Sequence, residues 1–159
     1  MYIKMVLFEG FSMTVAFAGH RMIFENLVRD TLAEAVQQAY NDGYTDFLVG
    51  THGKFDSLAT EICTALADKY DNVKVQIVVT SLSAANKYQQ FCKLHKNVCT
   101  TMYDIEDAHY KQRIVLSNRH MADSCDLLIC YVDTSRLNSG AAATLAYAKT
   151  IGKKIQNIY

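Results

Sequence analysis

Short runs of β-branched and aromatic residues alternate along this chain with longer stretches in which apolar residues recur at helical spacing. The short runs predict strands over residues 13–18, 47–49, 74–79, 99–103, 127–132 and 154–158. Strands that alternate with helices are typical of a parallel sheet covered by helices on both faces. We therefore predict an α/β fold, a three-layer sandwich with a mostly parallel central sheet flanked by helices.

Apolar residues in the helical stretches fall on one face, which predicts the side that packs on the sheet. In the first helix this face holds Phe24, Leu27, Val28, Leu32, Ala35, Val36 and Ala39, and in the second Leu58, Ile62, Ala65 and Leu66. In the third it holds Tyr88, Phe91, Cys92 and His95, with Ser83 as the N-cap. Two more helices are predicted, over residues 110–124 and 141–151.

The composition is that of a folded globular domain: 159 residues, of which 50% are hydrophobic and 20% charged. No repeat, low-complexity segment or linker rich in proline or glycine divides the sequence, so we expect one domain over residues 1–159. Residues 1–12 fit this plan least well, and we predict for them an extra edge strand or an interface arm.

Charge and cysteine usage limit the classes of partner. Lys plus Arg and Asp plus Glu both number 16, so there is no overall basic field for nucleic acid. No apolar run reaches the roughly 18 residues of a membrane span, and the first residues lack the features of a secretory signal. The five cysteines include no CxxC pair, which fits reduced thiols. We expect a cytoplasmic protein that binds neither nucleic acid nor membrane and needs no cofactor.

Three loops that contain glycine follow predicted strands, at the sheet edge where open α/β sheets bind ligands. They are Gly19-His20-Arg21, Gly50-Thr51-His52-Gly53 and residues 135–140. Glycine lets the backbone approach a ligand, and helix N-termini offer unpaired N–H groups to anions. Neither GxGxxG nor GxxxxGK[ST] occurs, which disfavours dehydrogenases and P-loop proteins. Each loop alone is consistent with an ordinary turn, whereas three at one edge favour a binding site.

Four ordered blocks carry a family resemblance: AFAGHR (16–21), VGTHGKFDSLATE (49–61), SNRHMADSCDLLICYVD (117–133) and SGAAATLAYAKTIGKKI (139–155). With them the chain resembles the SLOG superfamily, the Rossmann-like group named after the DNA-processing protein A and lonely-guy families, and within it the YpsA-like branch. The resemblance implies a Rossmann-like fold and a nucleotide-derived ligand above the strand ends. Some superfamily members bind such ligands as ADP-ribose-type signals and others as substrates, and the branch itself has no settled activity.

The loops and the resemblance together give the candidate ligand-binding residues. These are Gly19, His20, Arg21, Gly50, Thr51, Gly53, Asp56, Arg119, Asp133, Asn138, Ser139, Gly140 and Thr144. Asn118 also matches the third block of the family pattern. We assign no catalytic residue and no metal ligand.

Two positions depart from what the resemblance implies. Ser139-Gly140-Ala141 stands where the branch has GGT, which removes one glycine and one hydroxyl near the expected phosphate. Ala146 stands where the lonely-guy phosphoribohydrolases place their catalytic glutamate. We therefore favour a binding protein over an enzyme.

Several candidates also have a purely structural interpretation. For Arg21 we favour binding of a phosphate by its guanidinium group over an ion pair with a nearby carboxylate. His20 fits a ligand contact and a turn cap equally well. Asp56 suits either a ligand or the helix dipole, and Asp133 suits either a ribose hydroxyl or its own loop. Arg119 could reach across the cleft or be solvated.

Other kinds of chemistry are disfavoured. Glu61 lies five positions after Asp56, about 140° further around a helix, so the two do not form a carboxylate pair. Cys125 and Cys130 are predicted core residues rather than nucleophiles. A structural zinc needs four ligands, and the strongest cluster offers three, Cys92, His95 and Cys99.

The leading hypothesis is a protein that binds a nucleotide or NAD-derived molecule, of ADP-ribose, cyclic ADP-ribose or other cyclic nucleotide type, as a sensor or a sequestering sponge. A phage protein that sequesters an immune signal in the host cytoplasm would have this design. The first alternative is a nucleotide N-glycosidase or phosphoribohydrolase of lonely-guy type, in which Asp56 or Glu61 replaces the glutamate absent at Ala146. The second is a non-catalytic assembly protein. We expect a homodimer or higher homo-oligomer.

Overall fold

The computed structural model describes residues 12–159. The edge strand or interface arm predicted over residues 1–12 lies outside the described residues, except for Ser12, which has no regular structure. The strands in the described range are β1 (Met13–Gly19), β2 (Tyr44–Val49), β3 (Lys74–Val78), β4 (Val98–Thr101), β5 (Leu127–Tyr131) and β6 (Lys154–Asn157). The helices in this range are α1 (Glu25–Asn41), α2 (Lys54–Lys69), α3 (Leu82–Leu94), α4 (Tyr110–Ser124) and α5 (Gly140–Thr150).

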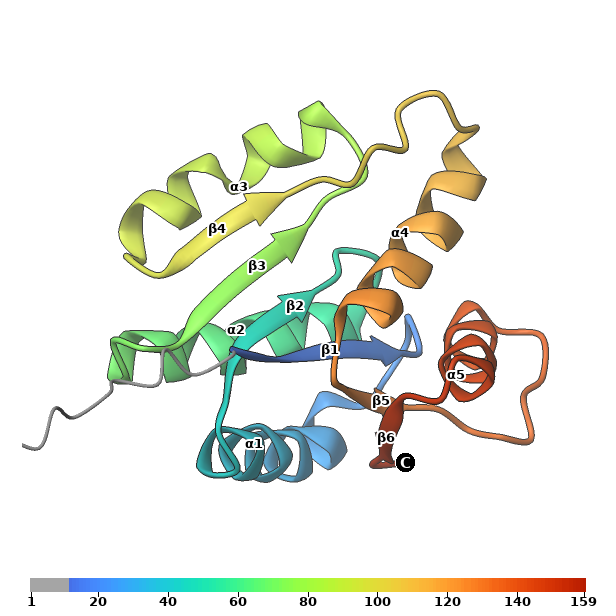
Figure 1. Cartoon of the computed structure of the whole chain (residues 1–159), viewed down its shortest axis with the longest axis horizontal. Helices are drawn as coiled ribbons and strands as arrows, with labels where there is room; N and C mark the ends of the chain where they lie inside the picture. Colours follow the sequence, from blue (N-terminus) through green and yellow to red (C-terminus); the bar gives the residue numbers. More distant parts are fainter. Residues whose placement is uncertain (1–11) are drawn as a thin grey trace, which may run out of the picture.

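The described strands form one parallel sheet in the order β4-β3-β2-β1-β5-β6 (Figure 1). The chain builds outward from β1 to β4, and α4 then returns it to the other side of β1, where β5 pairs from Val15↔Leu127 to Gly19↔Tyr131. The connections on either side of β1 therefore diverge at the carboxyl ends of β1 and β5. Such a switch point is where open α/β sheets leave room for a ligand.

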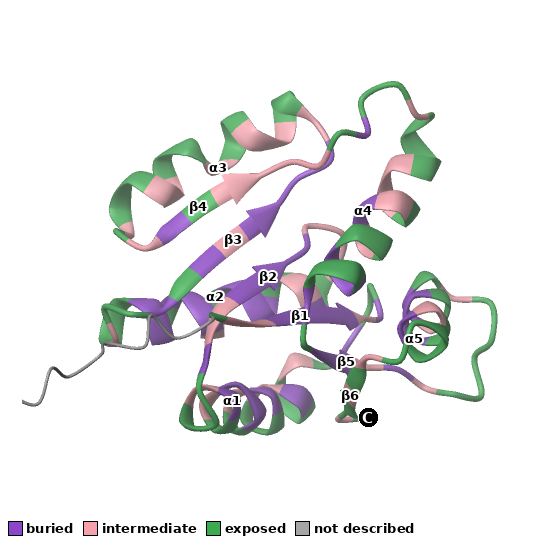
Figure 2. Ribbon diagram, in the orientation of Figure 1, coloured by how far each residue is buried: buried purple, intermediate pink, exposed green. Residues whose placement is uncertain are grey.

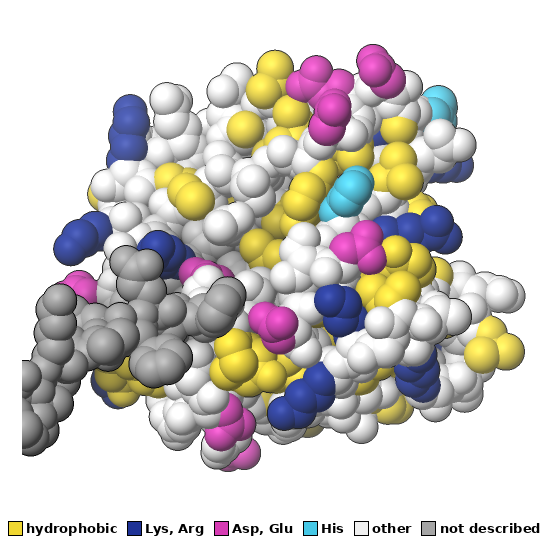
Figure 3. All heavy atoms as spheres, in the orientation of Figure 1, with side chains coloured by type: hydrophobic (Ala, Val, Ile, Leu, Met, Phe, Trp, Pro, Cys, Tyr) yellow, Lys and Arg dark blue, Asp and Glu magenta, His cyan; other side chains and the backbone are white. Residues whose placement is uncertain are grey.

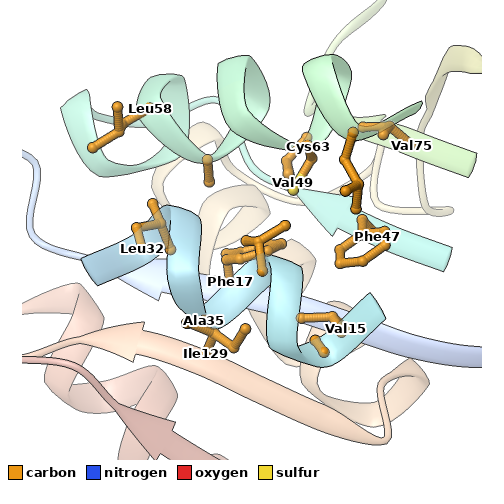
Figure 4. Close-up of a cluster of buried hydrophobic side chains, with 14 of the residues drawn as sticks. Val15, Phe17, Leu32, Ala35, Phe47, Val49, Leu58, Cys63, Val75 and Ile129 are labelled. Atoms are coloured by element: carbon orange, nitrogen blue, oxygen red, sulfur yellow. The ribbon is translucent and has the colours of Figure 1, made fainter. Parts of the chain in front are cut away.

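The sheet lies between two layers of helices, which confirms the predicted three-layer α/β sandwich. Phe17 and Phe47 belong to a core formed with α1, α2 and α3, and Figure 4 shows both rings among side chains of α1 and α2. Ala16 and Leu48, one position away on the same strands, face a second core formed with α4 and α5. This alternation follows from the pleat of the strands, which sends successive side chains to opposite faces. Burial on both faces explains the nearly continuous apolar runs of β1 and β5.

The predicted apolar faces of the first two helices are confirmed for most of their residues: Val28, Leu32, Ala35, Val36, Ala39, Leu58 and Leu66 are buried. Three positions are wrong. Leu27 is 76% exposed, and the buried face of α1 begins at the next residue, Val28. Phe24 is 81% exposed because it is the N-cap of α1, before the helical spacing begins. Ala65 of α2 is also exposed, next to the buried Leu66. One position changes the direction of a helical side chain by about 100°, which is enough to turn it from the core to solvent.

The third helix covers the sheet less completely than α1 and α2. Its predicted apolar face is confirmed for Tyr88, Phe91 and Cys92, which pack against the first core, but none of its residues is fully buried (Figure 2). The N-cap is Ser81 rather than Ser83, because the Ser81 Oγ accepts the N–H of Ala84. Within residues 12–159, no helix is both long enough and apolar enough to cross a bilayer.

Candidate ligand-binding crevice

A cavity of about 290 Å³ opens at the switch point, above the ends of β1 and β5. We call it the crevice. Its wall is formed by residues from the β1–α1 loop, the β2–α2 loop and its helix, α4, and the β5–α5 loop with the start of α5. The lining residues are Phe17, Ala18, Gly19, His20, Arg21, Met22, His52, Asp56, Ile114, Asn118, Arg136, Ser139, Gly140, Ala141 and Thr144.

The structure brings about half of the predicted binding residues together in this crevice. Those that line it are Gly19, His20, Arg21, Asp56, Ser139, Gly140 and Thr144. Those that do not line it are Gly50, Thr51, Gly53, Arg119, Asp133 and Asn138. His52 and Arg136 line it although neither was a candidate, and Asn118, which was noted as a match to the third block of the family pattern, lines it too.

The three predicted residues of the β2–α2 loop that do not line the crevice lie behind its wall. The Thr51 Oγ1 donates to the carbonyl of Val78 over 3.4 Å and so ties the loop to β3. Next to Gly53, the N–H of Lys54 donates to the Arg21 carbonyl over 2.9 Å. This bond joins the β2–α2 and β1–α1 loops and fixes the backbone that carries Arg21.

Arg119 and Asn118 are neighbours on α4, yet only Asn118 reaches the crevice. Its position one turn after Ile114 places both residues on the same face of the helix. The Arg119 guanidinium instead lies over the ring of Tyr147, 5.2 Å from its centroid, and the residue is exposed. Helical spacing around Ile114 was the sequence signal that could have selected Asn118 over Arg119.

His20 joins the tips of the two central strands. Its backbone N–H donates to the Tyr131 carbonyl over 3.3 Å, and its Nε2 accepts the N–H of Asp133 over 2.9 Å. Burial and then the charge of Arg136 lower the pKa of this imidazole, although Asp133 opposes them. The ring is therefore neutral at pH 7 with its proton on Nδ1, which leaves one N–H donor on a residue that lines the crevice.

Two glycines are required here by close approach. A Cβ on Gly19 would lie 2.2 Å from the Phe55 ring, and a Cβ on Gly50 would lie 2.7 Å from the Oδ2 of Asp56. The absence of a side chain at Gly50 thus makes room for a carboxylate at the start of α2. The same oxygen of Asp56 accepts the backbone N–H of His52 over 2.9 Å.

Asp56 is the acidic side chain of the crevice. Burial raises the pKa of its carboxyl to about 6, against the opposing effects of the His52 N–H and the Arg21 charge. Burial, followed by the charge of Arg21, lowers the pKa of His52, whose Nε2 lies 3.3 Å from the Thr80 Oγ1. At neutral pH the crevice therefore combines a neutral imidazole with a carboxyl that changes its charge close to physiological pH.

The crevice also contains positive charge. Arg21 and Arg136 both line it, and within residues 12–159 neither forms an ion pair with a carboxylate. The start of α5 adds a partial positive charge, because the first N–H groups of a helix have no carbonyl partner within it. The Ser139 Oγ accepts the N–H of Ala142 over 3.0 Å, so the N–H groups of Gly140 and Ala141 remain for another acceptor.

Three other polar residues considered in the sequence, Glu61, Asp133 and Asn138, lie outside the crevice. Glu61 forms a two-pronged ion pair with Arg29 over 2.7 and 3.1 Å, so the expectation that it does not pair with Asp56 is confirmed. The Asp133 Oδ1 accepts the N–H and hydroxyl of Ser135, which supports the loop-stabilising interpretation of this residue. Asn138 is exposed in the same loop.

The cysteines are placed as core residues or at the surface of α3 and β4. Cys125 and Cys130 are buried, as predicted, and burial raises the pKa of the Cys125 thiol to about 11. His95 bonds to the carboxylate of Asp68 over 2.9 Å rather than to a cysteine. No group of three metal-ligating side chains occurs within the described part of the chain.

Comparison with known proteins gives no relative of this chain: no protein-family model matches it, and neither does any curated protein.

Proposed function

We propose that the crevice binds the anionic part of a nucleotide or NAD-derived small molecule, of ADP-ribose or cyclic nucleotide type, and that the protein acts as a sensor or a sequestering sponge. The observation that carries the proposal is the convergence of Arg21, Arg136 and the N-terminus of α5 on one cavity at the switch point. Guanidinium groups and free helix N–H groups are the donors that proteins use for phosphate.

The size and the neutral surroundings of the crevice agree with this ligand class. About 290 Å³ is at the small end of ligand pockets and suits a phosphate with its sugar. Lys plus Arg and Asp plus Glu are equal in number, and basic and acidic side chains are interspersed on the face in Figure 3, so there is no broad positive field for a long nucleic acid backbone. Each of the four sequence blocks that resemble the SLOG superfamily contributes at least one residue to the lining of the crevice.

One observation favours an enzyme as the second candidate, a nucleotide N-glycosidase. Asp56 lines the crevice with a pKa of about 6, which suits a general acid or base near neutral pH. Glu61 cannot share this role because it faces Arg29 outside the crevice. Ala146 is exposed on α5 and does not line the crevice. Any catalytic carboxylate in this crevice is therefore Asp56.

The assembly protein stays a third candidate, supported by apolar side chains next to the crevice. Met22, Phe24 and Leu27 are each more than 70% exposed within six residues of chain. A group of large exposed apolar side chains is typical of a contact surface between proteins. Self-association through this surface is compatible with either of the other functions.

Thermal unfolding of the protein with AMP, cyclic AMP, NAD, ADP-ribose and cyclic ADP-ribose, followed by chromatography of each mixture, tests these functions. A ligand at 100 times its Kd stabilises the fold by about 2.7 kcal/mol, which raises Tm by about 5 to 11 °C. A shift with the compound recovered intact supports the sensor or sponge. A shift with a released base supports the glycosidase, and no shift with any compound contradicts both.

The Arg21→Ala variant provides the test at a single residue. Because charge-assisted hydrogen bonds contribute about 1.5 to 3 kcal/mol, we expect its ligand affinity to fall about 10- to 100-fold in calorimetry. Arg21 is exposed and affects stability only through its charge, which favours the ionised Asp56, so Tm without ligand should fall only slightly at neutral pH. Arg29→Ala is the matched control, since it removes an arginine that pairs with Glu61 outside the crevice. Equal ligand affinity in wild type and Arg21→Ala contradicts the proposal that Arg21 binds the phosphate.

A further inference from the structure

An exposed aromatic surface adjoins the crevice at the same edge of the sheet. Tyr131 ends β5, and Tyr159 lies two residues beyond the end of β6, the strand that pairs with β5. The two rings lie 5.0 Å apart between centroids, and the Tyr159 ring also meets His20 edge-on at 6.4 Å. Tyr159 is nevertheless 63% exposed, so much of its ring is free for another contact.

The position of Tyr159 is fixed by bonds to the end of β5. The Asn157 side chain accepts the N–H of Val132 over 3.0 Å and donates to the Val132 carbonyl over 2.9 Å. The same Oδ1 accepts the N–H of Tyr159 over 3.3 Å, and the N–H of Ile158 donates to the backbone carbonyl of Cys130 over 2.8 Å. An exposed ring on a fixed backbone loses little conformational entropy when a flat ligand packs on it.

His20 and Arg136 connect this aromatic surface with the crevice. His20 lines the crevice and contacts the rings of both Tyr131 and Tyr159. Arg136 lines the crevice too, and its backbone N–H donates to the carbonyl of Asp133 over 3.0 Å. The negative charge of Asp133 in turn raises the pKa of the Tyr159 hydroxyl, so this carboxylate lies on the hydroxyl side of the ring.

We propose that the exposed face of Tyr159 is the subsite for the heteroaromatic base of a nucleotide whose phosphate lies in the crevice. The inference rests on the proposed function and adds a residue that selects for a base. A purine or pyrimidine stacks on an aromatic ring through its π-face, whatever the base. The Asp133 carboxylate, at the edge of the same surface, accepts hydrogen bonds from a sugar hydroxyl or an exocyclic amino group.

The geometry favours an aromatic ligand over an aliphatic one at this surface. The Tyr159 ring lies against two aromatic rings, Tyr131 and His20, and Tyr131 itself stacks on Phe55 at 6.2 Å. A base on Tyr159 extends this series of rings outward from the core. The negative charge of Asp133 repels a phosphate from the Tyr159 surface. The phosphate therefore binds in the crevice and the base binds on the ring.

The test compares AMP with ribose 5-phosphate, which has the same phosphate and sugar but no base. Calorimetry measures both ligands on wild type, Tyr159→Ala and Tyr159→Phe. We expect Tyr159→Ala to lose about 10-fold or more in AMP affinity, to keep its affinity for ribose 5-phosphate, and to bind AMP less tightly than Tyr159→Phe, which retains the ring. Tyr40→Ala is the aromatic control, since Tyr40 stacks on Tyr70 near the C-terminal ends of α1 and α2.

Each outcome separates this inference from the proposed function. If wild type binds AMP and Tyr159→Ala binds it equally well, the base subsite is overturned and the phosphate site stands. Equal losses for AMP and ribose 5-phosphate in Tyr159→Ala also overturn the subsite, because the residue then acts on the whole site. Binding of neither ligand by wild type overturns the base subsite, and the panel of five compounds then decides whether the proposed function stands.

Discussion

Ionisation of Asp56 costs free energy in the folded protein, because burial raises the pKa of its carboxyl from 3.8 to about 6. Between these values the native state binds the proton more tightly than the unfolded state does. Stability therefore falls as pH rises from about 4 to 6 and remains reduced above that window. This pH dependence of stability is opposite to that of an ion-paired carboxylate. There the folded state has the lower pKa, and the stability that the ion pair contributes is lost in acid.

Substituting Asp56→Asn removes this cost while the amide oxygen can still accept the His52 N–H. We expect the variant to be more stable than wild type at pH 8 by up to about 3 kcal/mol, from about 1.4 kcal/mol per unit of pKa. The difference should shrink as pH falls to 4. Urea unfolding at pH 4, 6 and 8 measures it, with Asp30→Asn, an exposed carboxylate on α1, as the control. A variant less stable than wild type at pH 8 contradicts the assigned cause.

The motifs in the sequence mark segments that form the crevice, but they do not say which side chains of those segments line it. Arg21 and Ser139 belong to blocks that carry the family resemblance, and both line the crevice. Arg136 lies in a loop where no periodicity says which side chains point inward. His52 sits between two loop glycines, and its contact with Thr80 depends on the pairing of β2 with β3.

At the scale of the element, the N-terminus of α5 has both a stabilising and a binding role. The Ser139 Oγ caps the helix by accepting the N–H of Ala142, and Ser139 also lines the crevice. The Ser81 Oγ caps α3 in the same way, through Ala84, without lining the crevice. Within residues 12–159 the helices α3 and α5 thus have equivalent serine caps, and that of α5 belongs to the proposed site.

We expect Ser139→Ala and Ser81→Ala each to lower the free energy of unfolding by about 1 kcal/mol, the usual effect of losing a cap. Only Ser139→Ala should also weaken ligand binding, because only that helix start faces the crevice. Urea unfolding gives the first quantity and calorimetry with AMP the second. If both variants lost the same amount of ligand affinity, the loss would come from the lower stability of the fold, and the proposed role of Ser139 in the site would be wrong.

The elements themselves were largely predictable because their apolar patterns differ. The helix Tyr110–Ser124 begins and ends as predicted, and β1 is one residue longer than predicted. The errors lie in helical phase, at Phe24, Leu27 and Ala65. An apolar residue beside the buried face, such as Leu27 or Ala65, fits the helical spacing nearly as well as a residue on that face, so the pattern cannot fix where the face ends.

At the scale of the whole molecule, the crevice exists because the sheet order reverses beside β1. The sequence predicts alternating strands and helices but not that β5 pairs with β1, since that pairing joins residues more than 100 positions apart. The reversal brings Arg21 from the first connection and Arg136 from the fifth to one cavity. A ligand held by both must therefore restrain two loops that are distant in sequence.

Hydrogen exchange tests this coupling across the molecule. At 100 times its Kd, a ligand reduces any opening that releases it by about 100-fold. We expect slower exchange in the backbone amides of both the β1–α1 loop and the β5–α5 loop when AMP is bound. The turn that ends α1, around Gly43, should exchange unchanged, because it lies at the opposite edge of the sheet, where β2 begins. Slower exchange in only one of the two loops would mean that the ligand contacts one side of the crevice, and Arg21 and Arg136 would then not act as a pair.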